Sequence, residues 1–233
     1  NYESARGDQC DDCGKTLDSK ELINPRSKLN PDAKIEFRET EHLFFKLSEF
    51  RDVLLDWLSE GKEHWRSSVI NFTRNWLKEG LIDRAVTRDL DWGIEIPREG
   101  YENKRMYVWF EAVMGYYSAS VHWAKNQGKP DEWKKWWENE ESEHYYFMAK
   151  DNIPFHTIIW PAMLSGCGYK LPYDVPANEY LLLDSSQFSK SRRHAIWIPD
   201  YLDRYDPELL RFYLASIMPE QKDANFTWED YVT

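Results

Sequence analysis

Three short apolar runs, separated by segments long enough for helices, constrain the fold of this chain more than any other feature. The runs cover residues 106–110, 144–149 and 180–183. Strands that are apolar on both faces and alternate with helices are typical of a parallel sheet with right-handed crossovers. The sequence therefore predicts an α/β fold in which these runs form a βαβαβ half of a doubly wound domain.

Ligands of such folds bind beyond the carboxyl ends of the strands, where the sheet order reverses. Trp109 stands in the first run, Lys150 directly follows the second, and a polar loop begins after Leu183. We therefore expect the ligand site of this chain near these three positions.

The intervening segments show the 3.6-residue periodicity of helices. We expect helices over 112–126 and over 153–164, the second closed by Gly166. Residues 206–208, Asp-Pro-Glu, combine a capping carboxylate, a proline at the first helical position and an acid near the positive helix end. They predict the start of a further helix.

The first part of the chain follows a different pattern. Residues 1–20 are rich in Asp, Gly and Cys and hold almost no apolar residues, which is typical of a small loop-built module. A strand is expected over 38–45. Two amphipathic helices should follow, the first capped by Ser48 and the second ended at Gly80 by left-handed backbone.

Composition limits the class of protein. A 233-residue chain with 42% hydrophobic residues can bury a sizeable core, and its longest apolar runs are far short of a membrane span. The first residues are polar and lack an apolar signal segment, so we expect a cytoplasmic address and no membrane partner. The net charge of -11 restricts any nucleic-acid contact to a local patch.

The loop over 185–193 holds the most informative chemistry. It follows an expected parallel strand and groups serine hydroxyls with three cations, Lys190, Arg192 and Arg193. A lysine can meet charge that develops on a leaving pyrophosphate, and serine hydroxyls can donate to its oxygens. The loop is thus either a polyphosphate site or a solvated basic turn, and its residue types alone do not decide between them.

Residues 188–192, Phe-Ser-Lys-Ser-Arg, resemble the KMSKS loop of class I aminoacyl-tRNA synthetases. Further segments are similar to methionyl-tRNA synthetases and follow in the family's order: 6–10 with 13–14, 38–42, 87–90 with 92–93, 108–112, 150–152 with 155–156, 195–202, 204–207 and 210–214. Together these segments span nearly the whole chain.

The resemblance implies the second half of a Rossmann-like nucleotide-binding domain, preceded by part of the connective insertion. Four regions follow from it: 1–45 as the connective remnant with a partial zinc knuckle, 46–97 as its helical end, 98–183 as the Rossmann-like half, and 184–233 as the KMSKS-type loop with stem-contact helices. The implied reaction is activation of methionine by ATP with Mg2+, followed by transfer to tRNA(Met).

The family's N-terminal half, with its HIGH signature, does not occur in the 233 residues, so we expect it in cis or in trans and expect this chain alone to be inactive. A split subunit or a non-catalytic, synthetase-like binding module is the alternative. A leucyl or valyl type is opposed by Trp109 and by 155–156, Phe-His. Two departures from the family stand out: Gln187 replaces the first lysine of the loop, and Ala149 replaces a frequent glycine.

The resemblance also assigns site residues. Positions lining the family's methionine pocket correspond to Trp109, Ala112, Tyr116, Phe155 and His156. A thioether favours aromatic edges, and a ring nitrogen of His156 is expected to approach the sulfur. The alternative is that these residues are core aromatics under a sheet.

For ATP, the resemblance implies Ser189, Lys190, Ser191 and Arg192, with Lys190 as the catalytic residue. Arg88 corresponds to a position near the substrate, and a structural cap formed with Asp89 is the alternative reading.

Cys10 and Cys13 resemble the second pair of a four-cysteine zinc knuckle. Such a site needs four thiolates, so two cysteines alone would not hold Zn2+ firmly. The sequence therefore predicts a zinc site that is incomplete within this chain.

Overall fold

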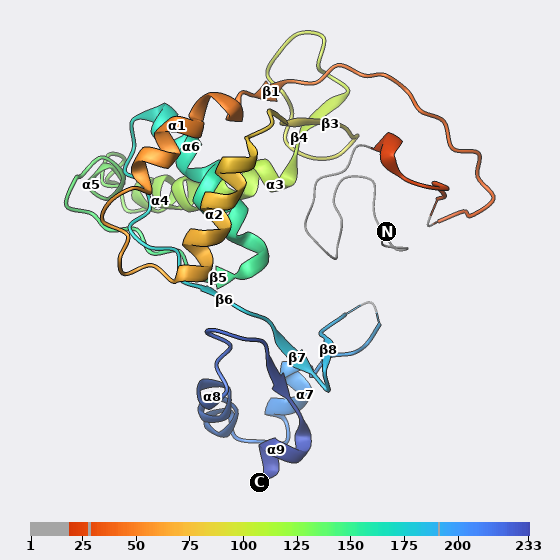
Figure 1. Cartoon of the computed structure of the whole chain (residues 1–233), viewed down its shortest axis with the longest axis vertical. Helices are drawn as coiled ribbons and strands as arrows, with labels where there is room; N and C mark the ends of the chain where they lie inside the picture. Colours follow the sequence, from red (N-terminus) through yellow and green to blue (C-terminus); the bar gives the residue numbers. More distant parts are fainter. Residues whose placement is uncertain (1–18, 28, 191) are drawn as a thin grey trace. The chain divides into compact units, whose positions relative to one another are not determined.

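The computed structural model describes residues 19–27, 29–190 and 192–233 (Figure 1). The chain divides into two units, Asn1–Leu43 and Phe44–Thr233. The described part of the first unit contains the short 3₁₀ helix η1, Ser19–Glu21, and is otherwise irregular. The expected zinc ligands lie outside the described residues.

The strand expected over 38–45 is present only as β1, Phe44–Phe45, which pairs antiparallel with β2, Arg84–Ala85. The prediction was wrong over 38–43, which is irregular. Charged and polar residues dominate that segment, so it has few apolar side chains to pack against a sheet.

Two helices follow β1 as expected, α1 over Arg51–Trp57 and α2 over Ser67–Glu79. Ser48 does not cap α1, because it lies in the 3₁₀ helix η2, Leu47–Phe50, and its N–H and hydroxyl both donate to Asp83 Oδ1 at 3.1 and 2.6 Å. Gly80 ends α2 with φ 98° and ψ 143°. The expected positive φ is confirmed, but the backbone is not left-handed helical.

The first apolar run does not form a strand along its whole length. The antiparallel pair β3, Thr87–Asp89, and β4, Lys104–Met106, ends where α3, Val108–Glu111, begins. Val108 and Trp109 are exposed, so the run lacks the two covered faces that a central strand needs. The helix expected over 112–126 is confirmed as η3, Ala112–Met114, followed by α4, Gly115–Asn126.

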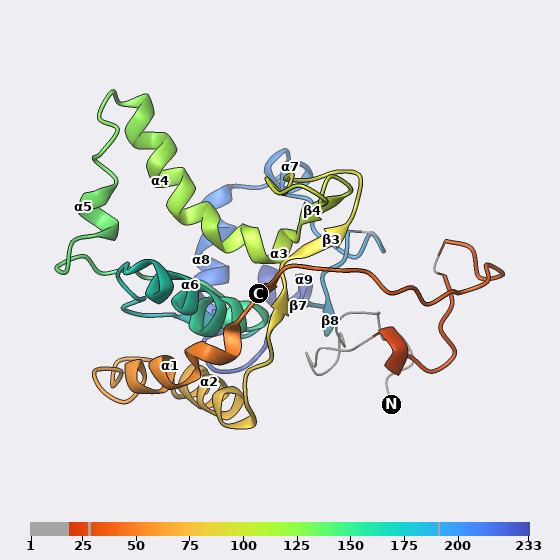
Figure 2. The ribbon, with the colours of Figure 1, turned by 90° about the horizontal axis from the view of Figure 1, so that it is seen from above.

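Figure 2 shows the chain running from α3 through α4 to the short helix α5, Lys134–Trp137. Beyond α5 the second apolar run ends in β5, Met148–Ala149, which pairs in parallel with β6, Ala177–Asn178. The crossover between them consists of η4, Lys150–Asn152, the π-helix η5, Phe155–Ile159, and α6, Trp160–Cys167. This is the parallel strand and helix crossover expected of an α/β fold.

The end of the crossover helix differs from the expectation by two residues. Gly166 lies inside α6, where an added Cβ would stand 3.3 Å from the Phe50 ring. The left-handed exit belongs to Gly168, with φ 71° and ψ 24°. Gly166 therefore allows close packing, and Gly168 ends the helix.

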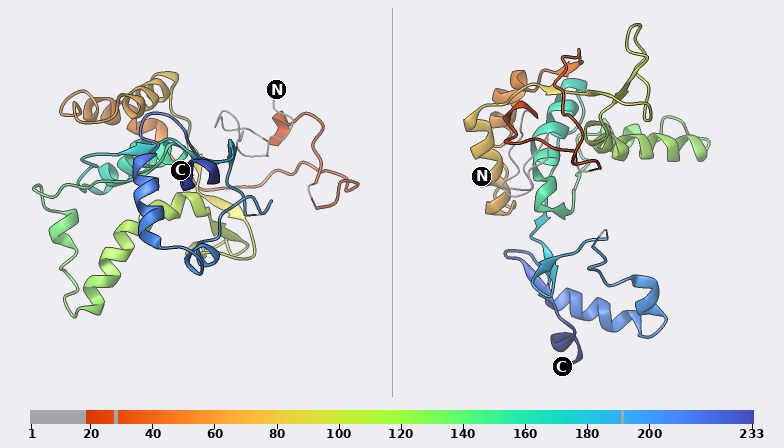
Figure 3. Two further views of the ribbon diagram at one scale, coloured as in Figure 1. Left: turned by 90° about the horizontal axis from the view of Figure 1, so that it is seen from below. Right: turned by 90° about the vertical axis from the view of Figure 1, so that its right-hand side faces the viewer.

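The third run forms β7, Leu181–Leu183, as expected. It does not join β5, and instead pairs in parallel with β9, Ala224–Phe226, and antiparallel with β8, Ser186–Gln187. The single sheet expected to join all three runs was therefore wrong within the described part of the chain. Two separate parallel pairs take its place, and Figure 3 shows β6 continuing into β7.

The connection from β8 to β9 contains α7, Ile198–Leu202, and α8, Pro207–Ser216, and α9, Trp228–Val232, follows β9. Asp206 Oδ1 accepts from the Glu208 N–H at 2.8 Å, which confirms the expected cap of α8. This part of the chain carries the loop that resembles KMSKS.

Two hydrophobic clusters form the core of the second unit between Phe45 and Ala177. One gathers side chains of η2, α1, α2 and the crossover, and the other joins the region of α4 and α5 to α6. Phe155, Met148 and Met163 pack against both clusters. The start of the π-helix therefore lies where the two clusters meet, and its residues are held from both sides.

No helix in the described ranges is both long and apolar enough to cross a membrane.

Candidate functional site

His156 is the most constrained residue of the candidate site. It lies in the π-helix, is only 5% exposed, and burial lowers the pKa of its ring. Its Nδ1 is 3.0 Å from the Asn152 carbonyl, which can only accept, so Nδ1 carries the proton. Nε2 of the neutral ring then accepts from the Tyr116 hydroxyl at 2.8 Å. Both ring nitrogens therefore have partners within the chain, and the approach of His156 to a methionine sulfur stays a prediction.

Tyr146 supports this pair. Its ring centroid is 5.1 Å from that of Tyr116 and 5.6 Å from that of His156. Its hydroxyl accepts from Trp160 Nε1 at 2.9 Å, and burial raises its pKa to about 12. The sequence contains no signal for Tyr146, because Tyr145, Tyr146 and Phe147 are all aromatic. In the structure Tyr145 and Phe147 are exposed and Tyr146 is buried.

Trp109 and Phe155 form the neighbouring part of the same aromatic surface. Their ring centroids are 6.2 Å apart, and Trp109 is exposed whereas Phe155 packs against both cores. Ala112 and Tyr116 follow Trp109 at spacings of three and seven residues along helical backbone, which places the three on one face. The structure thus brings Trp109, Tyr116, Phe155 and His156 together as an open aromatic wall, with Ala112 on the same helix face as Trp109 and Tyr116.

Arg88 has a different setting. Its Nη1 donates to the carbonyls of Ala85 and Thr87 at 3.0 and 2.8 Å, and its guanidinium carbon lies 3.8 Å from the Tyr107 ring centroid. Asp89 forms its ion pair with the buried Lys104 at 2.6 Å. Arg88 thus braces β3 and the start of α3, and its contact with a substrate stays a prediction.

The loop after β7 is a small hairpin fixed at its base. Ser189 and His194 exchange backbone hydrogen bonds of 2.8 and 3.0 Å, and His194 Nε2 donates to the Leu183 carbonyl at 2.8 Å. Lys190 and Arg192 are exposed at its tip, and neither forms an ion pair within the described residues. Ser191 lies outside the described residues. The hairpin therefore presents cations on an anchored base.

A family model described as tRNA synthetases class I (M) matches residues 1–233. The chain belongs to this family. A methionine--tRNA ligase of Dehalococcoides mccartyi is 58% identical over 232 residues, which cover 99% of this chain and 41% of that protein. One of Thermomicrobium roseum is 54% identical, with 99% of this chain and 40% of that protein covered.

A solved structure of Mycobacterium tuberculosis methionyl-tRNA synthetase in complex with methionyl-adenylate has the same fold, with a TM-score of 0.72 at 21% identity. The similarity covers 94% of this chain and 42% of that one. The class I synthetase fold is therefore shown. The chain spans about two fifths of the length of the curated relatives that it matches.

Within the described residues, no group of three or more His, Cys, Asp or Glu side chains could hold a metal ion. Cys10 and Cys13 fall outside those ranges, so the Zn2+ knuckle stays a prediction.

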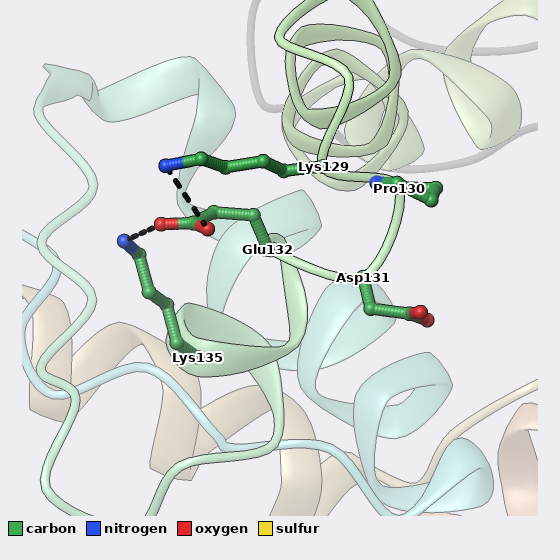
Figure 4. Close-up of a pocket in the computed structure, with 5 residues that line it drawn as sticks. All are labelled: Lys129, Pro130, Asp131, Glu132 and Lys135. Atoms are coloured by element: carbon green, nitrogen blue, oxygen red, sulfur yellow. Dashed lines mark hydrogen bonds and ion pairs between the residues drawn. The ribbon is translucent and has the colours of Figure 1, made fainter.

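A surface hollow between α4 and α5 lies apart from the aromatic wall. Figure 4 shows its lining, which consists of Lys129, Pro130, Asp131, Glu132 and Lys135. The Glu132 carboxylate pairs with Lys135 and, at 3.9 Å, with Lys129. Because these charges already neutralise one another and no aromatic ring lines the hollow, it offers no site for methionine.

Proposed function

We propose that the chain is the part of a methionyl-tRNA synthetase that builds one wall of the methionine pocket and carries the loop that meets the ATP phosphates. The complete enzyme would activate methionine with ATP and ligate it to tRNA(Met) in the cytoplasm. The observation that carries this proposal is the aromatic wall in which Tyr116 and His156 are hydrogen-bonded beside Trp109 and Phe155. The relatives named methionine--tRNA ligase support it.

The wall suits a thioether. A sulfur atom is polarizable and gains from contact with ring edges, which Trp109, Phe155 and Tyr116 offer. Because both nitrogens of His156 are engaged within the chain, His156 acts by holding Tyr116 rather than by touching the sulfur. The Tyr116 oxygen is then the polar atom that the wall presents to the side chain of methionine.

The hairpin suits the phosphates of ATP. In adenylate formation the methionine carboxylate attacks the α-phosphorus, and the bond to the leaving pyrophosphate breaks. Lys190 would meet the negative charge that grows on the pyrophosphate, with Ser189 and Arg192 beside it and Ser191 completing the set. ATP would bring its own Mg2+. Gln187 carries no charge, so Lys190 has less help here than in relatives with lysine at that position.

Part of the substrate site should come from outside this chain, since the curated relatives are more than twice as long as the region they share with it. We expect the other part of the catalytic domain to hold the adenine and the methionine amino group, in cis or in trans. A non-catalytic binding module with the same fold is the second candidate.

Methionine-dependent ATP–pyrophosphate exchange separates the two candidates. The chain should be inactive alone and active when the remaining part of the synthetase is supplied. Failure of every complete combination to exchange pyrophosphate, with methionine binding retained, would favour the binding module. Full activity of the 233-residue chain alone would refute the expected division of the site.

A further inference from the structure

Two cations from separate parts of the chain hold β6 and the connection from β6 to β7. The first is Lys150, which directly follows β5. Its Nζ donates to Glu179 Oε2 at 2.6 Å and to Asp223 Oδ1 at 2.9 Å, and lies 4.4 Å from the Tyr180 ring centroid. One ammonium group therefore joins the end of β5 to the connection and to the residue before β9.

The second cation is Arg66, the residue that precedes α2. Its Nη1 donates to the Ala177 carbonyl at 2.6 Å and to Asn178 Oδ1 at 2.7 Å. The same nitrogen reaches the Glu220 carbonyl at 3.2 Å, and Nη2 lies 3.6 Å from Glu220 Oε1. Arg66 thus holds β6 together with the loop that leads to β9.

Hydrogen bonds from three backbone N–H groups tie the same two segments to each other. The Glu179 N–H donates to the Pro219 carbonyl at 2.8 Å, and the Tyr180 N–H donates to Asp223 Oδ1 at 2.9 Å. The Ala224 N–H donates back to the Tyr180 carbonyl at 2.9 Å. These bonds connect the segment before β7 to the segment before β9. A displacement of Lys150 or Arg66 would therefore shift the first residues of β7 and β9 together.

The contact between Lys150 and Glu179 is better shielded than an ordinary surface ion pair. The Lys150 side chain is 33% exposed and that of Glu179 is 24% exposed. Burial alone would lower the pKa of Lys150, but its hydrogen bonds to the Glu179 and Asp223 carboxylates and their negative charges outweigh burial and raise that pKa. Lys150 is therefore charged at neutral pH, and removing its charge leaves two neighbouring carboxylates without their shared cation.

β7 transmits this arrangement to the KMSKS-type hairpin. The strand ends at Leu183, whose carbonyl accepts from His194 at the base of the hairpin, and Ser185 N–H donates to Asn225 Oδ1 at 2.7 Å. Only two residues separate Tyr180 from Leu183. The orientation of the hairpin thus follows from the contacts that Lys150 makes at the other end of the strand.

We propose that Lys150 and Arg66 form an ionic lock that fixes the orientation of the β7–β9 pair relative to β5 and β6, and that Lys150 is a positioning residue for adenylate formation. The second part rests on the proposed function. Lys150 acts through the strand rather than on the phosphates, because its ammonium is already held by Glu179 and Asp223.

The lock itself is tested by hydrogen exchange on the 233-residue chain, without any activity. Lys150→Met should speed exchange of the Glu179, Tyr180 and Ala224 amides by about tenfold or more, whereas Lys150→Arg should speed it less. Lys134→Met is the matched control, since Lys134 forms an exposed pair with Asp131 at 2.9 Å. Unchanged exchange at the three amides in Lys150→Met, or an equal change in the control, would overturn the lock.

The positioning role is tested in the complete enzyme by pyrophosphate exchange. Lys150→Met should lower kcat about tenfold and change the KM for methionine less than about twofold, and Lys150→Arg should recover part of the loss. Asp223→Asn, which keeps an acceptor for Tyr180, should resemble Lys150→Met, and the double variant should be little worse than either.

The outcomes separate the two proposals. Faster amide exchange with an unchanged kcat would overturn the positioning role and leave the lock. An inactive complete enzyme with the native lysine would refute the proposed function, while the exchange of the three amides would still decide whether the lock exists.

Discussion

The hydrogen bond between Tyr116 and His156 can be tested by removing one heavy atom, the hydroxyl oxygen of Tyr116. Tyr116→Phe removes only the hydroxyl that donates to His156 Nε2 at 2.8 Å. The other ring nitrogen keeps its bond to the Asn152 carbonyl, so the ring cannot turn to use the freed nitrogen without breaking that bond. The variant therefore leaves an acceptor without its donor in a side chain that is 5% exposed.

The size of the effect follows from burial on the two sides of the bond. An unsatisfied buried polar group costs about 1–3 kcal/mol. Tyr116 is 45% exposed, so water can approach from its side, and the cost should fall near the lower end, about 1 kcal/mol. Tyr205→Phe is a matched control, because Tyr205 is 46% exposed and its hydroxyl has no hydrogen bond to the described residues.

The assay is urea unfolding of the 233-residue chain at about pH 8, where His156 is neutral. Coincident transitions by circular dichroism and tryptophan fluorescence would justify a two-state free energy. Tyr116→Phe should lower the free energy of unfolding by about 1 kcal/mol, and the Tyr205 control should leave it within about 0.5 kcal/mol. If Tyr116→Phe and Tyr205→Phe had equal free energies of unfolding, the assignment of His156 Nε2 as a buried acceptor would be refuted.

Three further predictions concern the same sites. Burial lowers the pKa of His156 below its ordinary 6.5, so the neutral ring contributes fully to stability above that pH, and the contribution falls as the pH drops through the folded pKa. His156→Gln should therefore flatten the loss of stability that urea titrations measure between about pH 8 and 5. Trp109→Ala in the complete enzyme should cut discrimination of methionine against norleucine and leucine by about 1–3 kcal/mol, measured as kcat/KM, and unchanged selectivity would return Trp109 to a packing role. Lys190→Ala should slow adenylate formation about 10²–10³-fold in pre-steady-state measurements, and Gln187→Lys should be neutral or slightly faster; a change confined to the dissociation constant of ATP would contradict a role in the transition state.

The helices of this chain could be predicted because their signals are local. Asp206 caps α8 through a hydrogen bond to a residue two positions away, and the periodic segment 112–126 is helical. Strand pairing depends on partners far along the chain. β7 was expected from its own apolar run, but its parallel partner β9 has the sequence Ala-Asn-Phe and no apolar run to mark it.

In the candidate site, too, the sequence predicts residues with local signals better than contacts between residues far apart in the chain. The family resemblance predicted Tyr116 and His156 as site residues, and the structure brings them into contact although they are 40 residues apart. The motifs did not indicate Tyr146, which touches the site only through ring packing. Nor did they indicate the pairing of Lys150 with Asp223, because the two residues are 73 positions apart and ordinary surface charges resemble both.

A three-residue turn connects the aromatic wall with the proposed ionic lock. η4 begins with Lys150, which holds Glu179 and Asp223, and ends with Asn152, whose carbonyl accepts from His156 Nδ1. Such a short 3₁₀ turn has little room to adjust one end without moving the other. Residues in contact or in one hydrogen-bond network show coupling of about 0.5–3 kcal/mol in double-mutant cycles. Lys150→Met and His156→Ala should therefore be non-additive in kcat, whereas Lys134→Met combined with His156→Ala should be additive, and additivity of both pairs would mean that the turn does not couple the wall to the lock.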